Sequence, residues 1–193
     1  MGRPRKFDSE AVLNVALRHF WSSGYTAAKL DDICQEAGIT KPSLYNAFGD
    51  KSNLYTAALG YYEKAFQARV MQALNAAGTA EEALEQYFDQ TASILADPAF
   101  PNGCLRVKTL SECATSHPEL IKVACTQRDA SINALVAVLG QYGYSGDRAR
   151  EIADFAVILS DGLAASALVV SSKRLKKNAC LAAKTTQTLL APD

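Results

Sequence analysis

The sequence predicts an all-α protein in which a small N-terminal three-helix unit joins a larger helical bundle through a long helix, about nine helices in all. Apolar residues recur at helical spacing along almost the whole chain, and the period-two alternation that marks a strand is missing. Glycine, proline and small capping residues divide the chain into segments of helical length. We expect one domain over residues 1–50 and a second over residues 51–193.

The composition is typical of a globular protein, with 49% hydrophobic and 21% charged residues and a formal net charge of zero. The richest apolar stretch, Phe155 to Val170, is interrupted by polar residues and a glycine, which argues against a membrane span. The basic N-terminus leads into no apolar segment, so we expect no secretory signal and a cytoplasmic protein. The five cysteines form no C-x-x-C pair. This spacing predicts no disulfide framework and no metal site, and we expect no cofactor.

The first predicted helix runs from about Asp8 to Ser23. Its apolar residues fall on one face, Asp8 has the side chain of an N-cap, and Gly24 can end the helix. A short second helix is expected from about Lys29 to Ala37. Gly38 follows it and can end it in the same way.

The third and fourth helices each follow a residue that can cap them. Thr40 can cap a short helix from Lys41 to Phe48, and Pro42 fits its first turn, where a missing N–H costs nothing. Asp50 can cap a long fourth helix that runs from Lys51 into the region of Ala77.

Five further helices are expected beyond Gly78 and Thr79. Prolines and glycines punctuate this part of the chain and give the approximate helix ends. The segments span about Ala80–Ala96, Cys104–Ser116, Pro118–Leu139, Asp147–Val170 and Lys176–Leu190.

Two short helices joined by a tight glycine turn, the second opened by a small polar residue, form the helix-turn-helix pattern. The second helix of such a pair can enter the DNA major groove when the first helix braces it across the backbone. Here the second helix needs few inward anchors, chiefly Leu44 and Phe48, so Lys41, Tyr45 and Asn46 can face outward. Lysine and hydroxyl groups suit phosphate oxygens, and asparagine can pair with adenine.

This region resembles the DNA-binding domain of the TetR, or tetracycline-repressor, family. The resemblance covers roughly Phe7 to Leu59 in one unbroken register, and beyond the fourth helix it is only architectural. It implies a transcriptional repressor that binds a near-palindromic DNA operator as a homodimer and is released by a small effector molecule. The residues that carry it are Gly24-Tyr25, Asp32-Ile33, Ala37-Gly38-Ile39-Thr40-Lys41, Ser43-Leu44-Tyr45, Phe48 and Lys51.

The resemblance also implies which residues contact DNA, with two departures from the family's pattern. The family's Ser or Thr at the start of the second helix is Ala28 here, and Thr26 or Lys29 is the candidate to replace its phosphate contact. The histidine that often follows the recognition-helix aromatic residues is Ala47 here, so base preference does not transfer from relatives. The implied contacts fall on Thr40, Lys41, Pro42, Ser43, Tyr45, Asn46 and Lys51.

The N-terminal arm adds a second candidate contact with DNA. Arg3, Arg5 and Lys6 lie close together, with no acidic residue before Asp8. Such an arm is either an electrostatic foothold on DNA phosphates or a solvated tail.

We expect a homodimer built from the last two helices, because one short recognition helix reads too few base pairs for specificity. Small residues on the eighth helix permit close helix approach, and two helix pairs can form a four-helix interface. The predicted interface residues are Phe155, Leu159, Gly162, Leu163, Ser166, Val170, Cys180, Ala183 and Leu189.

The length of chain beyond Leu59 predicts a domain that binds a small, partly apolar effector. The long fourth helix is the expected lever, because Lys51 would meet DNA at one end and Phe66 would reach the interior at the other. A tightly packed bundle without a cavity is the alternative. Helical-face reasoning directs these residues toward a common interior: Phe66, Tyr87, Phe88, Thr91, Leu105, Lys108, Leu110, Cys113, Ile121, Cys125 and Arg128.

Two of the polar residues in this part allow more than one interpretation. Cys104 opens a helix near Arg106, which favours a reactive, redox- or electrophile-sensing thiol, although a small packed side chain is the simpler hypothesis. Arg128 falls on an apolar stripe, where it must bind an anionic effector group, pair with an acid such as Glu112 or Asp161, or extend to solvent.

Two other functions remain open at this stage. One is an all-α binding or sensor protein whose helix-turn-helix does not engage DNA, and the other is a small helical enzyme. Neither His19 nor His117 lies at metal-ligand spacing from another candidate, and no G-x-S-x-G, H-E-x-x-H or P-loop motif occurs. The sequence therefore predicts a regulator rather than an enzyme.

Overall fold

The computed structural model describes residues 8–99 and 101–191, so the basic arm residues Arg3, Arg5 and Lys6 lie outside the described residues. Within these ranges the chain is helical and contains no β-strand, which confirms the predicted fold class. The elements are α1 (Ser9–Ala27), α2 (Leu30–Ala37), α3 (Lys41–Phe48), α4 (Lys51–Leu74), α5 (Ala80–Leu95), α6 (Leu105–Glu112), α7 (Pro118–Gln141), α8 (Gly146–Ser166), α9 (Ser172–Gln187) and the 3-10 turn η1 (Thr188–Leu190).

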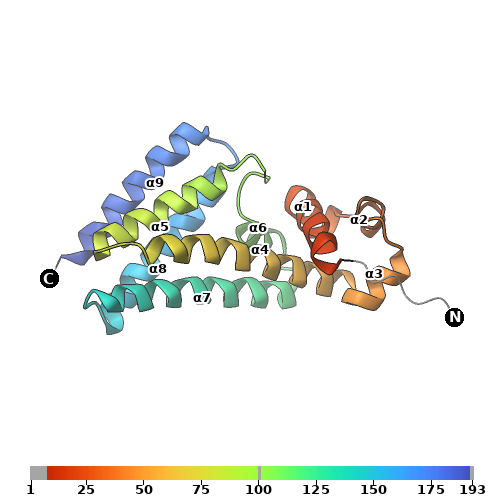
Figure 1. Ribbon diagram of the computed structural model, residues 1–193, viewed down its shortest axis with the longest axis horizontal. Helices are drawn as coiled ribbons and strands as arrows, with labels where there is room; N and C mark the ends of the chain where they lie inside the picture. The colour runs from red at the N-terminus through yellow and green to blue at the C-terminus, as the bar shows by residue number, and fades with distance from the viewer. Residues whose placement is uncertain (1–7, 100, 192–193) are drawn as a thin grey trace.

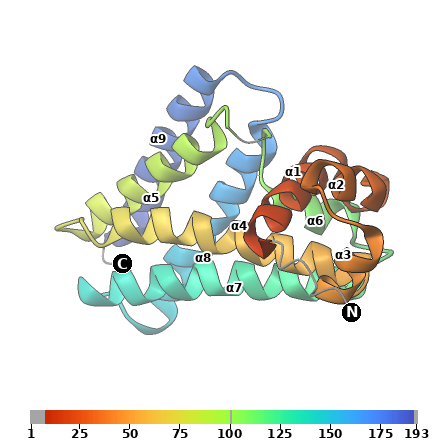
Figure 2. The same ribbon diagram turned by 45° about the vertical axis from the view of Figure 1, so that its right-hand side comes forward.

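The long helices α4 and α7 run side by side along the longest axis of the molecule (Figure 1). Helices α1, α2 and α3 gather at the N-terminal end of α4, while α5 and α9 pack together toward the other end (Figure 2). The short helix α6 contacts both α1 and α7, so it lies between the N-terminal unit and the rest of the bundle. No helix in the described part is long and apolar enough to cross a membrane.

The predicted N-caps of the first, third and fourth helices are confirmed. The Asp8 side chain accepts hydrogen bonds from the first-turn backbone of α1, at 2.9 and 3.3 Å. Thr40 accepts one from the Ser43 N–H at 3.3 Å, and Asp50 accepts one from the Asn53 N–H at 2.8 Å. Each cap satisfies a backbone donor that the helix leaves unpaired, so these local signals fix where the helices begin.

Helix α1 extends to Ala27, but it is broken at Gly24, where the sequence placed its end. Gly24 has a φ of 83°, a conformation that favours glycine. Beyond the break, the backbone N–H groups of Tyr25 and Thr26 donate to the two carboxylate oxygens of Glu112, at 3.1 and 2.9 Å. The C-terminal end of α6 therefore holds the broken end of α1.

Three other helix ends differ from the expected ones by four residues. Helix α6 ends at Glu112 rather than Ser116, and α8 ends at Ser166 rather than Val170. Helix α9 begins at Ser172 rather than Lys176, because the Ser171 side chain caps it. All three differences lie where the sequence has no glycine or proline to mark the end.

The interior is divided into two hydrophobic cores that share α4. The first joins α1, α2 and α3 to the first half of α4, around Phe20 and Tyr55, and extends to Leu120 of α7. The second joins the rest of α4 to α5, α7, α8 and α9, around Phe88. The expected domain boundary at residue 50 thus falls at the start of a helix that belongs to both cores.

Candidate nucleic-acid interface and interior polar cluster

Helix α3 lies at the end of the molecule away from α5 and α9 (Figure 1). A single fully buried side chain, Leu44, anchors it, and Phe48 is half-buried. Tyr45 is 48% exposed, which is high for a large aromatic side chain. The exposed residues of this helix are Lys41, Pro42, Tyr45, Asn46 and Ala47. One face of α3 therefore packs against the protein, and the opposite face is exposed and open to a partner.

Two predicted contact residues form part of the cap of α3. The hydroxyls of Thr40 and Ser43 lie 2.9 Å apart. Thr40 is exposed and Ser43 is half-buried. In this structure the two side chains therefore stabilise the first turn of α3.

The two lysines of this region that are predicted to contact DNA, Lys41 and Lys51, already have partners within the chain. The Lys41 Nζ lies 2.8 Å from Asp31 Oδ1, and this hydrogen-bonded ion pair raises the pKa of Lys41. The Lys51 Nζ donates to the Thr26 carbonyl at 3.2 Å and lies 5.0 Å from the centre of the Tyr25 ring. Burial lowers the pKa of Lys51. Lys51 therefore braces α4 against the end of α1, whereas exposed Lys41 can exchange Asp31 for another anion.

The start of α2 has no side-chain cap. Its N-cap residue is Lys29, which is exposed and makes no capping hydrogen bond. Ala28 is buried, at 5% exposed, and the Thr26 backbone is bound to Glu112. Neither proposed replacement for the family's Ser or Thr therefore caps α2, and Lys29 stays exposed beside the start of this helix.

The predicted effector-pocket residues do not converge on one cavity. Phe88 belongs to the C-terminal core, whereas Leu105 and Cys113 belong to the N-terminal one. Cys125 is exposed on α7. The helical spacing of apolar residues indicates which face of a helix is buried, but it does not indicate which neighbouring helix that face contacts.

Lys108 points away from the expected interior. Its Nζ donates to the carbonyls of Trp21 and Ser22, at 2.9 and 3.0 Å. These are among the last carbonyls of α1 before the break at Gly24, where a helix end favours a cation. Together with Glu112 one turn later, Lys108 joins α6 to the N-terminal unit.

A cluster of charged side chains lies in the interior where α4, α6, α7 and α8 meet. Arg106 is 3% exposed. It donates to Glu63 at 3.3 Å, to Ser131 at 3.0 Å and to Asp161 at 3.1 Å. The Arg128 Nε donates to the other carboxylate oxygen of Asp161 at 3.1 Å. The ion pair with Asp161 is one of the alternatives that the sequence left open for Arg128, whereas the sequence pointed to Arg106 only as a neighbour of Cys104.

The charges of this cluster are balanced. Two guanidinium groups face two carboxylates, Glu63 and Asp161. Burial raises the pKa of Glu63, and the positive charge of Arg106 offsets part of this effect. Buried ion pairs of this kind seldom add net stability, which makes a functional role for the cluster worth testing.

Two voids meet at Tyr62 and Phe66. The interior void has a volume of about 10 Å³ and is lined in part by Thr91, Cys104 and Arg106. The Tyr62 hydroxyl donates to the Cys104 sulfur at 3.3 Å. The second void is a mostly apolar crevice of about 120 Å³ between α1, α4 and α5. Of the predicted pocket residues, Phe66 lines both voids, and Tyr87 lines a further void of about 20 Å³.

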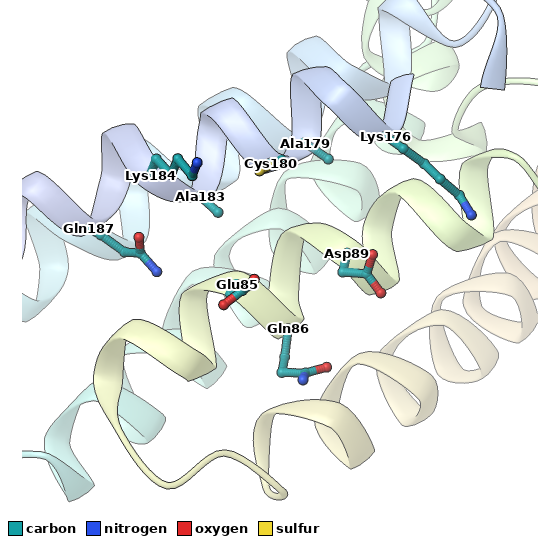
Figure 3. A pocket seen from close by; sticks show the side chains of 9 residues that line it. All are labelled: Glu85, Gln86, Asp89, Lys176, Ala179, Cys180, Ala183, Lys184 and Gln187. Carbon is teal, nitrogen blue, oxygen red and sulfur yellow. The ribbon is translucent and has the colours of Figure 1, made fainter. Parts of the chain in front are cut away.

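A groove of about 200 Å³ lies between α5 and α9 (Figure 3). Glu85 and Asp89 line it from α5, and Lys176 and Lys184 line it from α9. Cys180 and Ala183, both predicted for the dimer interface, also line this groove within one protomer.

The exposed large hydrophobic side chains of the described residues lie on two parts of the chain. One is Tyr45 on α3. The other is formed by α8, the turn after it and α9, where Ile158 is 55%, Leu168 64%, Val169 84% and Leu181 64% exposed. These side chains are the candidates for an apolar surface that another molecule covers.

The predicted interface residues overlap this surface only in part. Gly162 and Cys180 are exposed, whereas Leu163 and Ala183 are 5% and 2% exposed and belong to the core of the protomer. The other predicted residues are half-buried: Phe155, Leu159, Ser166, Val170 and Leu189.

The N-terminal unit matches a known family. Residues 12–58 match the family model described as bacterial regulatory proteins, tetR family. The uncharacterized HTH-type transcriptional regulator YezE of Bacillus subtilis (strain 168) is 33% identical over 122 residues, 63% of each chain. The HTH-type transcriptional repressor ComR of Escherichia coli (strain K12) is 33% identical over 126 residues, 65% of this chain and 59% of that protein. The matches thus span about three-fifths of the length of these two relatives.

The whole fold matches solved structures. A cysteine mutant of the TetR family transcriptional regulator CifR, complexed with 26-bp double-strand operator DNA, superimposes with a TM-score of 0.84 at 28% identity, covering 94% of this chain and 98% of that one. SCO4454, a TetR-family transcriptional regulator from Streptomyces coelicolor, has a TM-score of 0.81 at 22% identity, covering 94% and 96%. The second likeness concerns the fold alone.

Proposed function

The chain belongs to the TetR family of bacterial regulatory proteins, and from that premise we propose that it is a cytoplasmic repressor that binds a near-palindromic DNA operator as a homodimer and leaves it when a small effector binds. The exposure of α3 carries this proposal. Its Lys41, Tyr45 and Asn46 side chains face outward from a helix that Leu44 anchors. The CifR relative is complexed with operator DNA, and the ComR relative is a repressor, which supports the same direction of action.

The chemistry of the α3 face suits the major groove. Asn46 can pair with an adenine edge, and the Tyr45 hydroxyl and the Lys41 ammonium suit phosphate oxygens. Lys29 is exposed at the start of α2 and offers a further cation to the backbone. The exposed apolar side chains of α8 and α9 support a two-fold dimer, which would place two copies of α3 about 34–36 Å apart, or a multiple of that distance.

The proposal is tested by selecting bound sequences from a random pool of DNA duplexes and measuring their affinity at several salt concentrations. We expect a near-palindromic site and a steep loss of affinity with salt, because each neutralised phosphate releases counterions. A protein that binds no duplex at low salt would support the alternative of an all-α binding protein without a DNA target.

Two single substitutions on α3 are expected to affect binding differently. Lys41→Ala should weaken binding to every sequence and flatten the salt slope by about 0.9, as expected for one lost phosphate contact. Asn46→Ala should cost about 1–3 kcal/mol at one base pair of the site and leave the salt slope unchanged. Titrations of the selected site and its single-base variants distinguish the two effects. Full affinity in a double variant Lys41→Ala, Tyr45→Ala would contradict the site assignment.

Removing the partner of Lys41 is expected to tighten binding. Asp31 holds the Lys41 ammonium at 2.8 Å and brings a negative charge to the DNA face. Asp31→Asn should therefore raise affinity about two- to tenfold at low salt, with a smaller gain at high salt, because exposed ion pairs are weak and screened. Asp32→Asn is the matched control one position further along α2, where no ion pair with Lys41 exists among the described residues. Equal effects of the two variants would indicate that only the overall charge matters.

A further inference from the structure

We infer that the two voids that meet at Tyr62 and Phe66 form one binding site, and that its ligand is a small aromatic molecule with a single uncharged hydrogen-bond acceptor, of the aryl ketone type. The inference rests on the proposed response to an effector, and it adds the place and the chemical class of that effector.

The polar end of the site is defined by an unpaired donor. The Arg106 Nε is buried and has no hydrogen-bond acceptor among the described residues, although both terminal nitrogens of the same guanidinium are paired. Buried donors are rarely left unpaired, because an unmade hydrogen bond is costly. Arg106 lines the interior void of about 10 Å³, which has room for roughly one water-sized atom. The void therefore fits one acceptor oxygen.

The charges around Arg106 favour a neutral acceptor. Arg106 and Arg128 already face Glu63 and Asp161. A carboxylate ligand would bring a third negative charge next to these two, and a cationic ligand would face two guanidinium groups without offering an acceptor. A carbonyl oxygen meets the Nε donor and leaves the charge balance unchanged.

The apolar end of the site is the crevice between α1, α4 and α5. Leu17, Trp21, Tyr61 and Ile94 contribute to its walls, and its volume is about 120 Å³. A dry cavity of roughly 150 Å³ is known to hold a benzene molecule, so this crevice suits about one aromatic ring. Arg69 lies at the crevice and pairs with Asp97 at 3.5 Å.

The side chains of Tyr62 and Phe66 separate the two voids. The Tyr62 ring packs edge-on against Trp21, with centroids 4.7 Å apart, and its hydroxyl is bound to Cys104. Phe66 is half-buried, has a ring that cannot hydrogen-bond, and lines both voids. Rotation of the Phe66 side chain joins the voids, so that a ligand whose ring lies in the crevice can direct its carbonyl oxygen to the Arg106 Nε.

The position of the crevice links such a ligand to DNA binding. Its walls come from α1 on one side and from α4 and α5 on the other. Trp21 of α1 is held by Lys108 through its carbonyl, and α4 is braced to the same end of α1 by Lys51. A ring between α1 and α4 therefore acts on the contact between these two helices, which sets the position of α3. The ligand releases DNA if it binds more tightly to the conformation that has the lower affinity for DNA.

The test uses the full-length protein and three probes of similar size: acetophenone, ethylbenzene and benzoate. Binding is followed by the fluorescence of Trp21, the single tryptophan of the chain, and separately by the affinity for the selected operator. Acetophenone should bind about tenfold more tightly than ethylbenzene, which lacks the acceptor, and more tightly than benzoate, and it should weaken operator binding. Equal binding of acetophenone and ethylbenzene, or tightest binding of benzoate, would overturn the inference.

Three variants locate the site. In Arg106→Lys a methylene takes the place of the Nε–H while a charge remains for Glu63 and Asp161, so the tenfold preference for acetophenone should fall to about one. Phe66→Trp adds a second tryptophan, so it is followed by operator affinity alone, and its narrower passage should weaken the effect of acetophenone on operator binding. Arg150→Gln, at an exposed arginine of α8 that pairs with Asp154 and lines neither void, is the control and should preserve the preference. A preference that survives in Arg106→Lys at an unchanged melting temperature contradicts the assignment.

Failure of this inference is distinguishable from failure of the proposed function. If none of the probes changes the Trp21 fluorescence but another compound releases the protein from DNA, the site is wrong and the regulator stands. If no duplex binds, the proposed function fails, while the Trp21 titrations still decide whether the site exists.

Discussion

Gly162→Glu is expected to convert the dimer into monomers and to weaken binding to the palindromic operator by on the order of a thousandfold or more. Gly162 is exposed on α8, and an added Cβ there meets no other atom within 4 Å in the protomer. The substitution therefore leaves the fold of the protomer intact, and glutamate is more favourable than glycine in a helix. In a dimer packed through α8, the same side chain would bury an unpaired charge at the point of closest helix approach.

The matched control is Gly140→Glu on α7. Gly140 is also an exposed helical glycine without atoms around the added Cβ, and it lies on α7 rather than on α8 or α9. Sedimentation at micromolar concentration should show monomers for the Gly162 variant and dimers for the control. The two variants should have the same helical content, and their melting temperatures should differ only by the stability that dimerisation adds. A dimeric Gly162→Glu that keeps full operator affinity would place the interface elsewhere.

The N-terminal unit could be predicted almost residue by residue because its signals are local. Asp8, Thr40 and Asp50 cap their helices through bonds that span two or three residues, and Gly24 and Gly38 adopt positive φ where the sequence required an end. Such contacts depend on nothing beyond the neighbouring turn. The same locality explains why helix ends without a glycine or proline were misplaced by about four residues.

The interior could not be predicted in the same way, because it depends on which helices become neighbours. Successive residues of a helix point about 100° apart, so a prediction that is one position off moves a side chain from surface to core. Leu163 was expected at the dimer interface and is buried in the protomer, whereas Ile158 is exposed. Lys108 was expected inside and caps the end of α1. Arg106 was missed as a cluster residue because its partners come from three other helices.

Arg106→Met is expected to lower the free energy of unfolding at neutral pH by about 3–5 kcal/mol, the usual cost of removing one partner of a buried ion pair. Glu63 then loses the nearby positive charge and keeps its burial. Asp161 retains Arg128 at 3.1 Å, so the destabilisation arises mainly at Glu63. Arg128→Met is the comparison, because its pair is partly exposed, with 27% of the Arg128 side chain accessible, and a loss of about 1 kcal/mol or less is expected.

The loss in Arg106→Met should also depend on pH. Burial already raises the pKa of Glu63 above its ordinary value of 4.5, and without Arg106 that pKa rises further. A carboxyl whose pKa is raised on folding binds more protons in the folded state than in the unfolded state, so stability falls as pH rises from about 4.5 to the raised pKa. The difference in unfolding free energy between the parent and Arg106→Met should therefore narrow as pH is lowered toward 4.5, and the further change Glu63→Gln in the variant should remove this narrowing. Urea titrations of the three proteins across this pH range measure it, and a difference that stays constant with pH would mean that Glu63 is not the group left without its partner.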